Sequence, residues 1–274
     1  MKKKIIHILS GIFPKRFVDY AYYKLTHPQV HKLRPHEKEV IGKANKQRFQ
    51  FNEFDIQLYE WKAGPQKVML IHGWGGQAGN FADLIERLVA KNITVLAFDG
   101  PSHGNSSTGK GSTSLFEFAE LVGVLVEHFQ VSKLVSHSFG GVATTYSLSK
   151  KQHLEIDKYA LFTTPDRFAD RISVVAEQAG LHNKVKKKLI TKLELELKLD
   201  LSILNVSNFV KGISVKEAFI VHDTFDKVLS VEESKRVVEN WSAATLEEVR
   251  ETGHFRILRT DDVLTKVISF LEFD

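Results

Sequence analysis

A short apolar run that ends in a cluster of small residues is the feature that most restricts how this chain can fold. Residues 133–135 read Lys-Leu-Val, and residues 136–141 continue as Ser-His-Ser-Phe-Gly-Gly. A sharp turn between a buried strand and a helix crowds its neighbours, so the flanking positions must be small. Gly140 and Gly141 fit that need, and Ser136 is small enough to replace a glycine. The pattern predicts a strand, a tight turn that presents Ser138 and a helix, although an ordinary turn containing a serine has the same local sequence.

From residue 48 onward, the chain alternates apolar strand-like runs with helical segments. Alternation of apolar and polar residues over 48–52 and 54–61 predicts an antiparallel pair at a sheet edge. Further strands are expected at residues 67–72, 93–98, 133–137, 158–164, 216–222 and 245–251, with helices near 80–91, 114–129, 139–150, 231–241 and 261–272. Strands that alternate with helices form a parallel sheet covered on both faces. The sequence therefore predicts a doubly wound, mostly parallel α/β sheet.

Two segments fall outside this alternation. Residues 166–212 contain no convincing buried strand; 170–180 look helical, and 187–204 are rich in leucine. The leucine-rich part also alternates as a strand would, but Leu, Glu and Lys are strong helix formers and favour a helix.

The other segment is residues 1–47, in which three lysines precede the apolar run Ile5 to Phe13. This run is too short to span a bilayer, which needs about 20 apolar residues, and no small-residue cleavage site follows it. We expect a basic amphipathic helix that continues through the aromatic-rich residues 18–33. It either packs on the domain, which we favour, or contacts a membrane surface.

The composition, 43% hydrophobic and 26% charged, is ordinary for a globular protein. The formal net charge of +5 is modest, and much of it lies in the basic runs at residues 2–4 and 184–188 and not in a groove with stacking aromatic residues, so we expect no nucleic-acid partner. The chain has no cysteine, which excludes disulfides and thiolate chemistry and leads us to expect a cytoplasmic location. Histidines at strand ends and turns lack zinc-like spacing, so we expect no metal and no cofactor; these are His72, His103, His137 and His222.

Motifs at the ends of the other predicted strands have a specific order. They are His-Gly-Trp-Gly-Gly at 72–76, Asp-Gly-Pro-Ser-His-Gly-Asn-Ser at 99–106, His-Asp-Thr-Phe-Asp at 222–226 and Glu-Thr-Gly-His at 251–254. With the turn at Ser138, the order Ser, Asp, His resembles that of the α/β-hydrolase family, from roughly residue 49 to the C-terminus.

The resemblance implies a role for each polar group. Ser138 would be the nucleophile and His254 its general base, because a serine hydroxyl attacks only when a neighbouring imidazole accepts its proton. Asp226 would orient the imidazole, with Asp223 and Asp166 as alternative acids. Two main-chain N–H groups would hold the oxyanion, those of Trp74 and Phe139. The 99–106 motif would stabilise a loop, and His72 would shape the oxyanion loop.

The resemblance also implies a domain organisation and an activity. Residues 48–165 and 213–274 would form the hydrolase core, residues 1–47 a helical extension, and residues 166–212 a small helical lid that either lines an acyl-binding cavity or only completes the core. The expected reaction is cleavage of a small carboxylic ester or thioester with an apolar acyl part, through an acyl-enzyme. Serine as nucleophile argues against the dehalogenase and epoxide hydrolase branches, which use aspartate. A ligand-binding receptor or scaffold on the same fold is the alternative.

Overall fold

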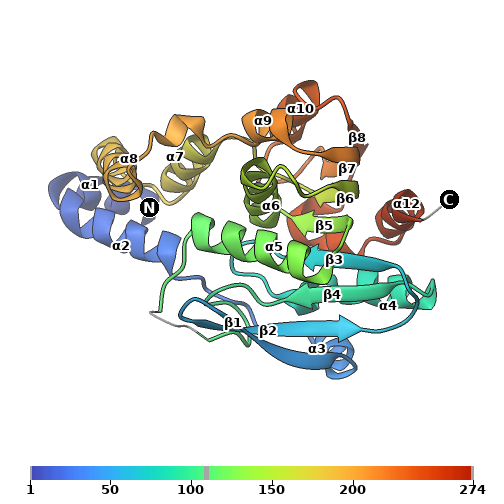
Figure 1. The fold of residues 1–274 in the computed structure, drawn as a ribbon. Helices are drawn as coiled ribbons and strands as arrows, with labels where there is room; N and C mark the ends of the chain where they lie inside the picture. Colours follow the sequence, from blue (N-terminus) through green and yellow to red (C-terminus); the bar gives the residue numbers. More distant parts are fainter. Residues whose placement is uncertain (1, 108–110, 273–274) are drawn as a thin grey trace.

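The computed structural model of the protein describes residues 2–107 and 111–272, and its centre is a sheet of eight strands (Figure 1). The strands are β1 Asn45–Phe51, β2 Phe54–Trp61, β3 Lys67–Ile71, β4 Thr94–Phe98, β5 Lys133–His137, β6 Ile156–Phe162, β7 Val215–Asp223 and β8 Ala244–Val249. Their order across the sheet is β1-β2-β4-β3-β5-β6-β7-β8. β2 pairs antiparallel with β1 and β4, and the other neighbours pair in parallel. The predicted α/β sheet, with its antiparallel edge, is confirmed.

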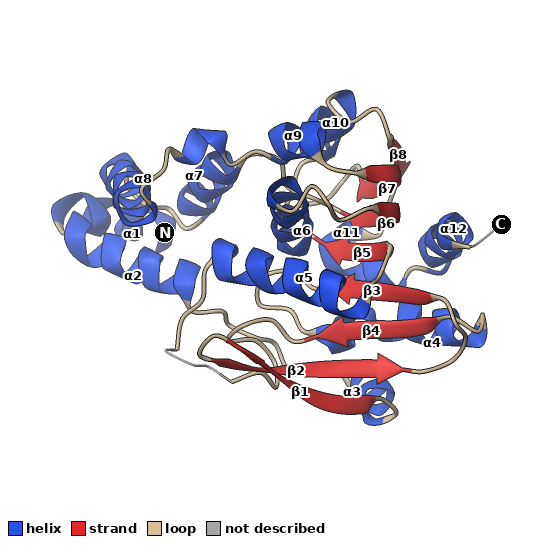
Figure 2. Ribbon diagram, in the orientation of Figure 1, coloured by secondary structure: helices blue, strands red, loops and turns tan. Residues whose placement is uncertain are grey.

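Helices cover both faces of this sheet, as Figure 2 shows. They are α3 Pro35–Gly42, α4 Ala82–Ala90, α5 Leu115–Phe129, α6 Phe139–Lys150, α9 Val206–Phe209, α10 Val231–Glu239, α11 Gly253–Arg256 and α12 Asp261–Leu271, with short 3-10 helices at Ala78–Phe81, Leu201–Ile203, Val210–Gly212 and Ile257–Arg259. Four further helices lie beyond the carboxyl ends of the parallel strands: α1 Lys2–Ile12, α2 Pro14–Thr26, α7 Phe168–Gln178 and α8 Asn183–Leu197 (Figure 1).

Each face of the sheet has its own hydrophobic core. Successive residues of a strand point to opposite faces, so Met69 and Ile71 of β3 join the core that contains α5 and α6. Val68 and Leu70 join the core that contains α4 and α12. Because such a strand is buried on both sides, its sequence is continuously apolar. This is the physical reason why the parallel strands could be recognised from the sequence.

The N-terminal helices and the helices of residues 166–212 pack against each other. We call α1, α2, α7 and α8 the cap; α8 contacts each of the other three helices. The main-chain N–H of His182, between α7 and α8, donates a 2.9 Å hydrogen bond to Oγ of Ser10 in α1. Leu189 and Leu193 of α8 are buried in the same core as α5 and α6. Residues 166–212 add no strand to the sheet. Among the helices of the described residues, none is long and apolar enough to cross a bilayer.

Several boundaries differ from the sequence-based expectation. The leucine-rich segment is helical, as predicted, but α8 begins at Asn183 and ends at Leu197, so the extension to residue 204 was wrong. Helix through residue 33 was also wrong, because α2 ends at Thr26. Helix α3 was not predicted. Its signals are Pro35 in the first turn and Glu37, whose carboxylate accepts from the main-chain N–H of Arg34 at 2.7 Å.

Candidate active site

The turn between β5 and α6 has the strained geometry that its sequence predicts. Ser138 has φ 52° and ψ −119°, a conformation that residues with a side chain seldom adopt. A Cβ on Gly140 would lie 2.6 Å from the carbonyl oxygens of Ile71 and His72, so only glycine fits this approach of α6 to β3. Ser136 replaces the usual glycine, and its buried hydroxyl lies 2.7 Å from the hydroxyl of Tyr159. The replacement is therefore accommodated by a hydrogen bond.

The structure brings the predicted serine, histidine and aspartate into contact. Nε2 of His254 lies 3.1 Å from Oγ of Ser138, and its Nδ1 lies 2.7 Å from Oδ2 of Asp226. An ionised carboxylate can only accept, so Nδ1 carries the proton and donates to Asp226. Nε2 is then free to accept from the hydroxyl of Ser138. This is the arrangement in which an imidazole can remove the serine proton.

Asp226 is held in its ionised form. Its Oδ1 accepts hydrogen bonds from the main-chain N–H groups of Val228 at 2.7 Å and Leu229 at 3.0 Å. Burial acts to raise the pKa of Asp226, but the contact with His254 and these two N–H groups outweigh burial and hold the pKa below its ordinary value. A carboxylate that stays charged stabilises an imidazolium beside it.

The two alternative acids make other contacts. Asp223 accepts four hydrogen bonds, from the main-chain N–H groups of Phe225, Thr252 and Gly253 and from the hydroxyl of Thr252. It thereby fixes the segment that carries His254. Asp166 accepts from the main-chain N–H of Ser207 at 2.8 Å and pairs with Nε of Arg236 at 3.1 Å. Neither carboxylate contacts His254 among the described residues.

Two buried histidines shape the loop that follows β3. His72 donates from Nδ1 to the carbonyl oxygen of Gly73 at 2.8 Å and accepts from the main-chain N–H of Gly100 at 2.8 Å. His103 accepts from the main-chain N–H of Gly75 at 3.1 Å. Burial lowers the pKa of His72 to about 4; burial and the nearby His72 lower the pKa of His103 to about 3. Both rings therefore stay neutral and keep one nitrogen as an acceptor.

The two predicted oxyanion groups lie beside the turn. The rings of Trp74 and Phe139 pack edge to face, with centroids 5.2 Å apart. Within residues 2–107 and 111–272, neither the Trp74 nor the Phe139 main-chain N–H has a hydrogen-bond acceptor. Two free donors next to a serine can stabilise a negative oxygen.

Two side chains near the site make contacts that the sequence did not predict. His137 donates from Nε2 to the main-chain carbonyl oxygen of His254 at 2.9 Å. Arg171 of α7 donates to the carbonyl oxygen of Val228 at 2.6 Å, which ties the cap to the loop that holds Asp226. A histidine at a strand end and an arginine on a helix give no local signal of such contacts. Across the described residues, no cluster of three or more His, Asp or Glu side chains could hold a metal ion.

Known proteins resemble this chain in sequence and in fold. The profile of the family described as "Serine aminopeptidase, S33" matches residues 65–211, more than half of the chain. A dihydrolipoyllysine-residue acetyltransferase component of the acetoin cleaving system from Cupriavidus necator is 32% identical over 98 residues, which make up 34% of this chain and 26% of that protein. The chain thus matches about a quarter of the length of this curated relative.

Solved structures share the fold over most of the chain. An esterase from Pyrococcus furiosus has a TM-score of 0.65 at 19% identity, covering 91% of this chain and 97% of that one. A thioesterase domain from the curacin biosynthetic pathway has a TM-score of 0.60 at 16% identity, covering 84% and 99%. The fold and the profile match lead to one assignment: the chain belongs to the S33 serine aminopeptidase family, a family of hydrolases with the α/β-hydrolase fold.

Proposed function

We propose that this protein is a serine hydrolase that cleaves a carboxylic ester or thioester through an acyl-enzyme intermediate. Ser138 is the nucleophile, His254 the general base and Asp226 the acid that orients it. The observation that carries the proposal is the continuous contact from Asp226 through His254 to a serine held at positive φ. A strained residue is retained only where the surrounding fold holds it, and such residues cluster at active sites.

The proposed reaction has two steps. As Oγ of Ser138 attacks the carbonyl carbon, Nε2 of His254 takes the serine proton, and the main-chain N–H groups of Trp74 and Phe139 hold the oxyanion. When the intermediate collapses, the bond to the alcohol or thiol breaks and His254 gives that group the proton. Water then attacks the acyl-enzyme with the same base, which releases the acid and restores Ser138. No cofactor takes part in this scheme.

The choice of ester or thioester rests on a chemical argument and on fold relatives. Alcohols and thiols leave more readily than amines, so a serine and an imidazole suffice for them without special activation of the leaving group. The fold neighbours include proteins described as an esterase and as a thioesterase domain. The family description names an aminopeptidase, so amides are the direct competitor class.

Covalent labelling tests the nucleophile. A fluorophosphonate should add once to the wild-type protein, and intact-mass measurement should find no adduct on Ser138→Ala. Ser149→Ala, which removes a hydroxyl from the outer part of the same helix, is the matched control and should label normally. Persistent labelling of Ser138→Ala would show that another residue is the nucleophile.

A substrate panel tests the reaction. We expect turnover of p-nitrophenyl esters and acyl thioesters of increasing chain length to exceed that of aminoacyl p-nitroanilides. Faster turnover of the anilides would replace the proposed substrate class by amides. If the protein turns over none of them yet binds a small apolar ligand tightly, the receptor alternative replaces the enzyme.

A further inference from the structure

Helix α1 exposes an apolar stripe to solvent. Ile5, Ile8, Leu9 and Ile12 recur at the spacing that places side chains on one face of a helix, and they are 51%, 60%, 41% and 61% exposed. Phe13, in the break before α2, is 52% exposed. Isolated exposed apolar residues are common, but a contiguous group of five on consecutive turns indicates an interaction surface for a protein, a membrane or a ligand.

The opposite face of α1 attaches it to the cap. Oγ of Ser10 accepts from the main-chain N–H of His182, and the rings of His7 and His182 lie 4.7 Å apart. Gly11 also faces this ring, because a Cβ there would lie 3.1 Å from it. The helix is therefore held through small and polar residues, with its largest apolar residues directed outward. Burial against the protein does not explain the stripe.

Basic residues surround the stripe. Residues 2–26 contain six Lys or Arg and one acidic residue, Asp19, which pairs with Lys192 of α8 at 3.2 Å. On a helix with 100° per residue, Lys2 and Lys4 fall on either side of the stripe. Arg16 lies over the ring of Phe13, at 5.9 Å from its centroid. In the described part of the chain, no carboxylate is within ion-pair distance of Lys2, Lys4 or Arg16.

We propose that this stripe, Ile5, Ile8, Leu9, Ile12 and Phe13 with its basic rim, binds the surface of an anionic lipid bilayer. An apolar face flanked by lysines lies in the plane of the membrane interface, with the lysine stems along the acyl boundary and the ammonium groups at the phosphates. Eleven residues cannot span a bilayer, so the helix lies on the membrane. Since α2 and α8 contact α1, the cap as a whole meets the lipid. This inference does not depend on the proposed hydrolase activity.

Vesicle co-sedimentation tests the surface with the full chain. We expect the wild type to bind vesicles of phosphatidylcholine with 30% phosphatidylglycerol, to bind pure phosphatidylcholine more weakly, and to lose affinity with added salt. Ile8→Asn/Ile12→Asn should bind at least tenfold more weakly. The matched control is Ile203→Asn, which removes an equally exposed isoleucine outside α1 and should bind normally. The affinity of Lys2→Gln/Lys4→Gln for anionic vesicles should fall about fivefold per charge removed, with no change on pure phosphatidylcholine.

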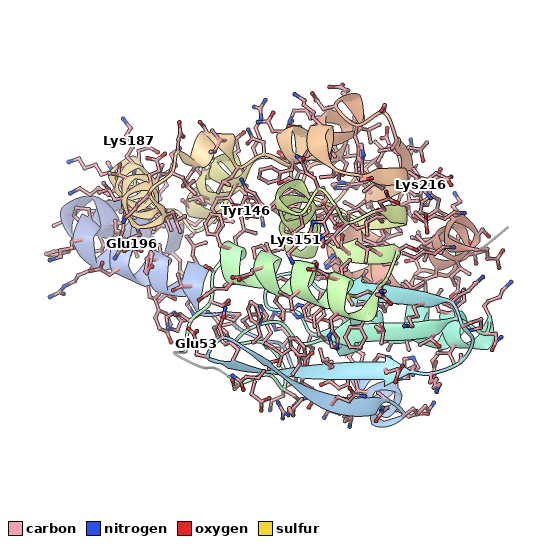
Figure 3. All side chains as sticks on the ribbon, viewed as in Figure 1. Glu53, Tyr146, Lys151, Lys187, Glu196 and Lys216 are labelled. Carbon is pink, nitrogen blue, oxygen red and sulfur yellow. The ribbon has the colours of Figure 1, made fainter. Side chains whose placement is uncertain are left out.

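A fluorescent reporter separates insertion from unfolding. The chain has no cysteine, so Ile8→Cys can be labelled uniquely with an environment-sensitive dye, and Lys216→Cys serves as the remote control. Figure 3 shows Lys216 at the opposite end of the molecule from Lys187 of the cap. We expect a blue-shifted emission with anionic vesicles for the dye at position 8 and no shift at position 216.

Three results would overturn the proposal. The first is a wild type that binds neither kind of vesicle. The second is an equal emission shift with anionic vesicles for the dye at position 8 and for the dye at position 216. A wild type that is dimeric by light scattering, with a monomeric Ile8→Asn/Ile12→Asn variant and no vesicle binding, would assign the stripe to a second copy of the chain. Circular dichroism of each variant shows whether it is folded, and fluorophosphonate labelling reports separately on the active site.

Discussion

The ring of His137 donates a hydrogen bond from Nε2 to the main-chain carbonyl oxygen of His254, at 2.9 Å. The residue before the candidate nucleophile thereby holds the backbone of the candidate base. Burial and the nearby His254 lower the pKa of His137 to about 3, so this donor stays neutral. The contact joins the end of β5 to α11, which carries His254. It therefore helps to set the position of the imidazole relative to Ser138.

Loss of this donor should affect turnover more than substrate binding. His137→Phe keeps a ring of similar size but cannot donate, so His254 can shift relative to Ser138. We expect kcat to fall about 10- to 100-fold because small misplacements of a catalytic group have large effects, with KM changed less than threefold. Steady-state kinetics on one ester substrate measures both constants. A proportionate rise in KM with unchanged kcat would contradict a positioning role.

Replacement of Asp226 should separate catalysis from stability. Asp226→Asn presents an amide to Nδ1 of His254 and favours the wrong imidazole tautomer, so we expect kcat to fall about 10⁴-fold. Asp223→Asn weakens an acceptor of four hydrogen bonds, and we expect it to lose about 2–3 kcal/mol of unfolding free energy with a much smaller change in kcat. Urea titration and ester hydrolysis on both variants provide the comparison. The reverse pattern would make Asp223 the catalytic acid.

Buried neutral histidines should make the fold sensitive to acid. The pKa values of His72, His103 and His137 fall from 6.5 to about 4, 3 and 3 in the folded protein. Below pH 6.5 the unfolded chain binds protons at these residues while the folded chain does not, so stability falls as the pH drops through this window. Each histidine should remove about 2 kcal/mol of unfolding free energy by pH 5. Urea titrations between pH 7 and pH 5 measure this loss of unfolding free energy. In the His103→Gln variant, the unfolding free energy should change less steeply with pH.

A methyl group on Gly140 should disrupt the turn. Its Cβ would lie 2.6 Å from two main-chain carbonyl oxygens, which cannot move away without shifting β3. We expect Gly140→Ala to lower the free energy of unfolding by about 2–3 kcal/mol, as overpacking in a well-packed core does. Gly42→Ala, at the end of α3, is the matched control because nothing lies within 4 Å of its added Cβ. Equal thermal unfolding temperatures for the two variants would show that the approach of α6 to β3 is not tight.

The sequence by itself determined the parallel strands, the turn at Ser138 and the order of the motifs. Strands buried on both faces must be continuously apolar, and a strained turn must have small neighbours, so each leaves a local pattern. For the acid, the resemblance favoured Asp226 but kept Asp223 and Asp166 as alternatives. Asp223 ends β7 and Asp226 lies three residues later in the loop that follows, and no local pattern tells which carboxylate reaches His254. Tertiary structure separates them, because Asp223 accepts from the main-chain N–H groups of Thr252 and Gly253, whereas Asp226 contacts the ring of His254.

The cap was also decided only by tertiary structure. The sequence predicted helices in the N-terminal segment and in residues 166–212, but it did not predict that these helices pack together. Ser10 and His182, which form a hydrogen bond in the cap, are separated by more than half of the chain. Periodicity shows that a helix has an apolar face, but which face is covered depends on the shape of a distant partner. In α1 the small residues Ser10 and Gly11 fit against His182, and the apolar residues are left outside. Close packing, and not hydrophobicity alone, therefore sets the orientation of the N-terminal helix.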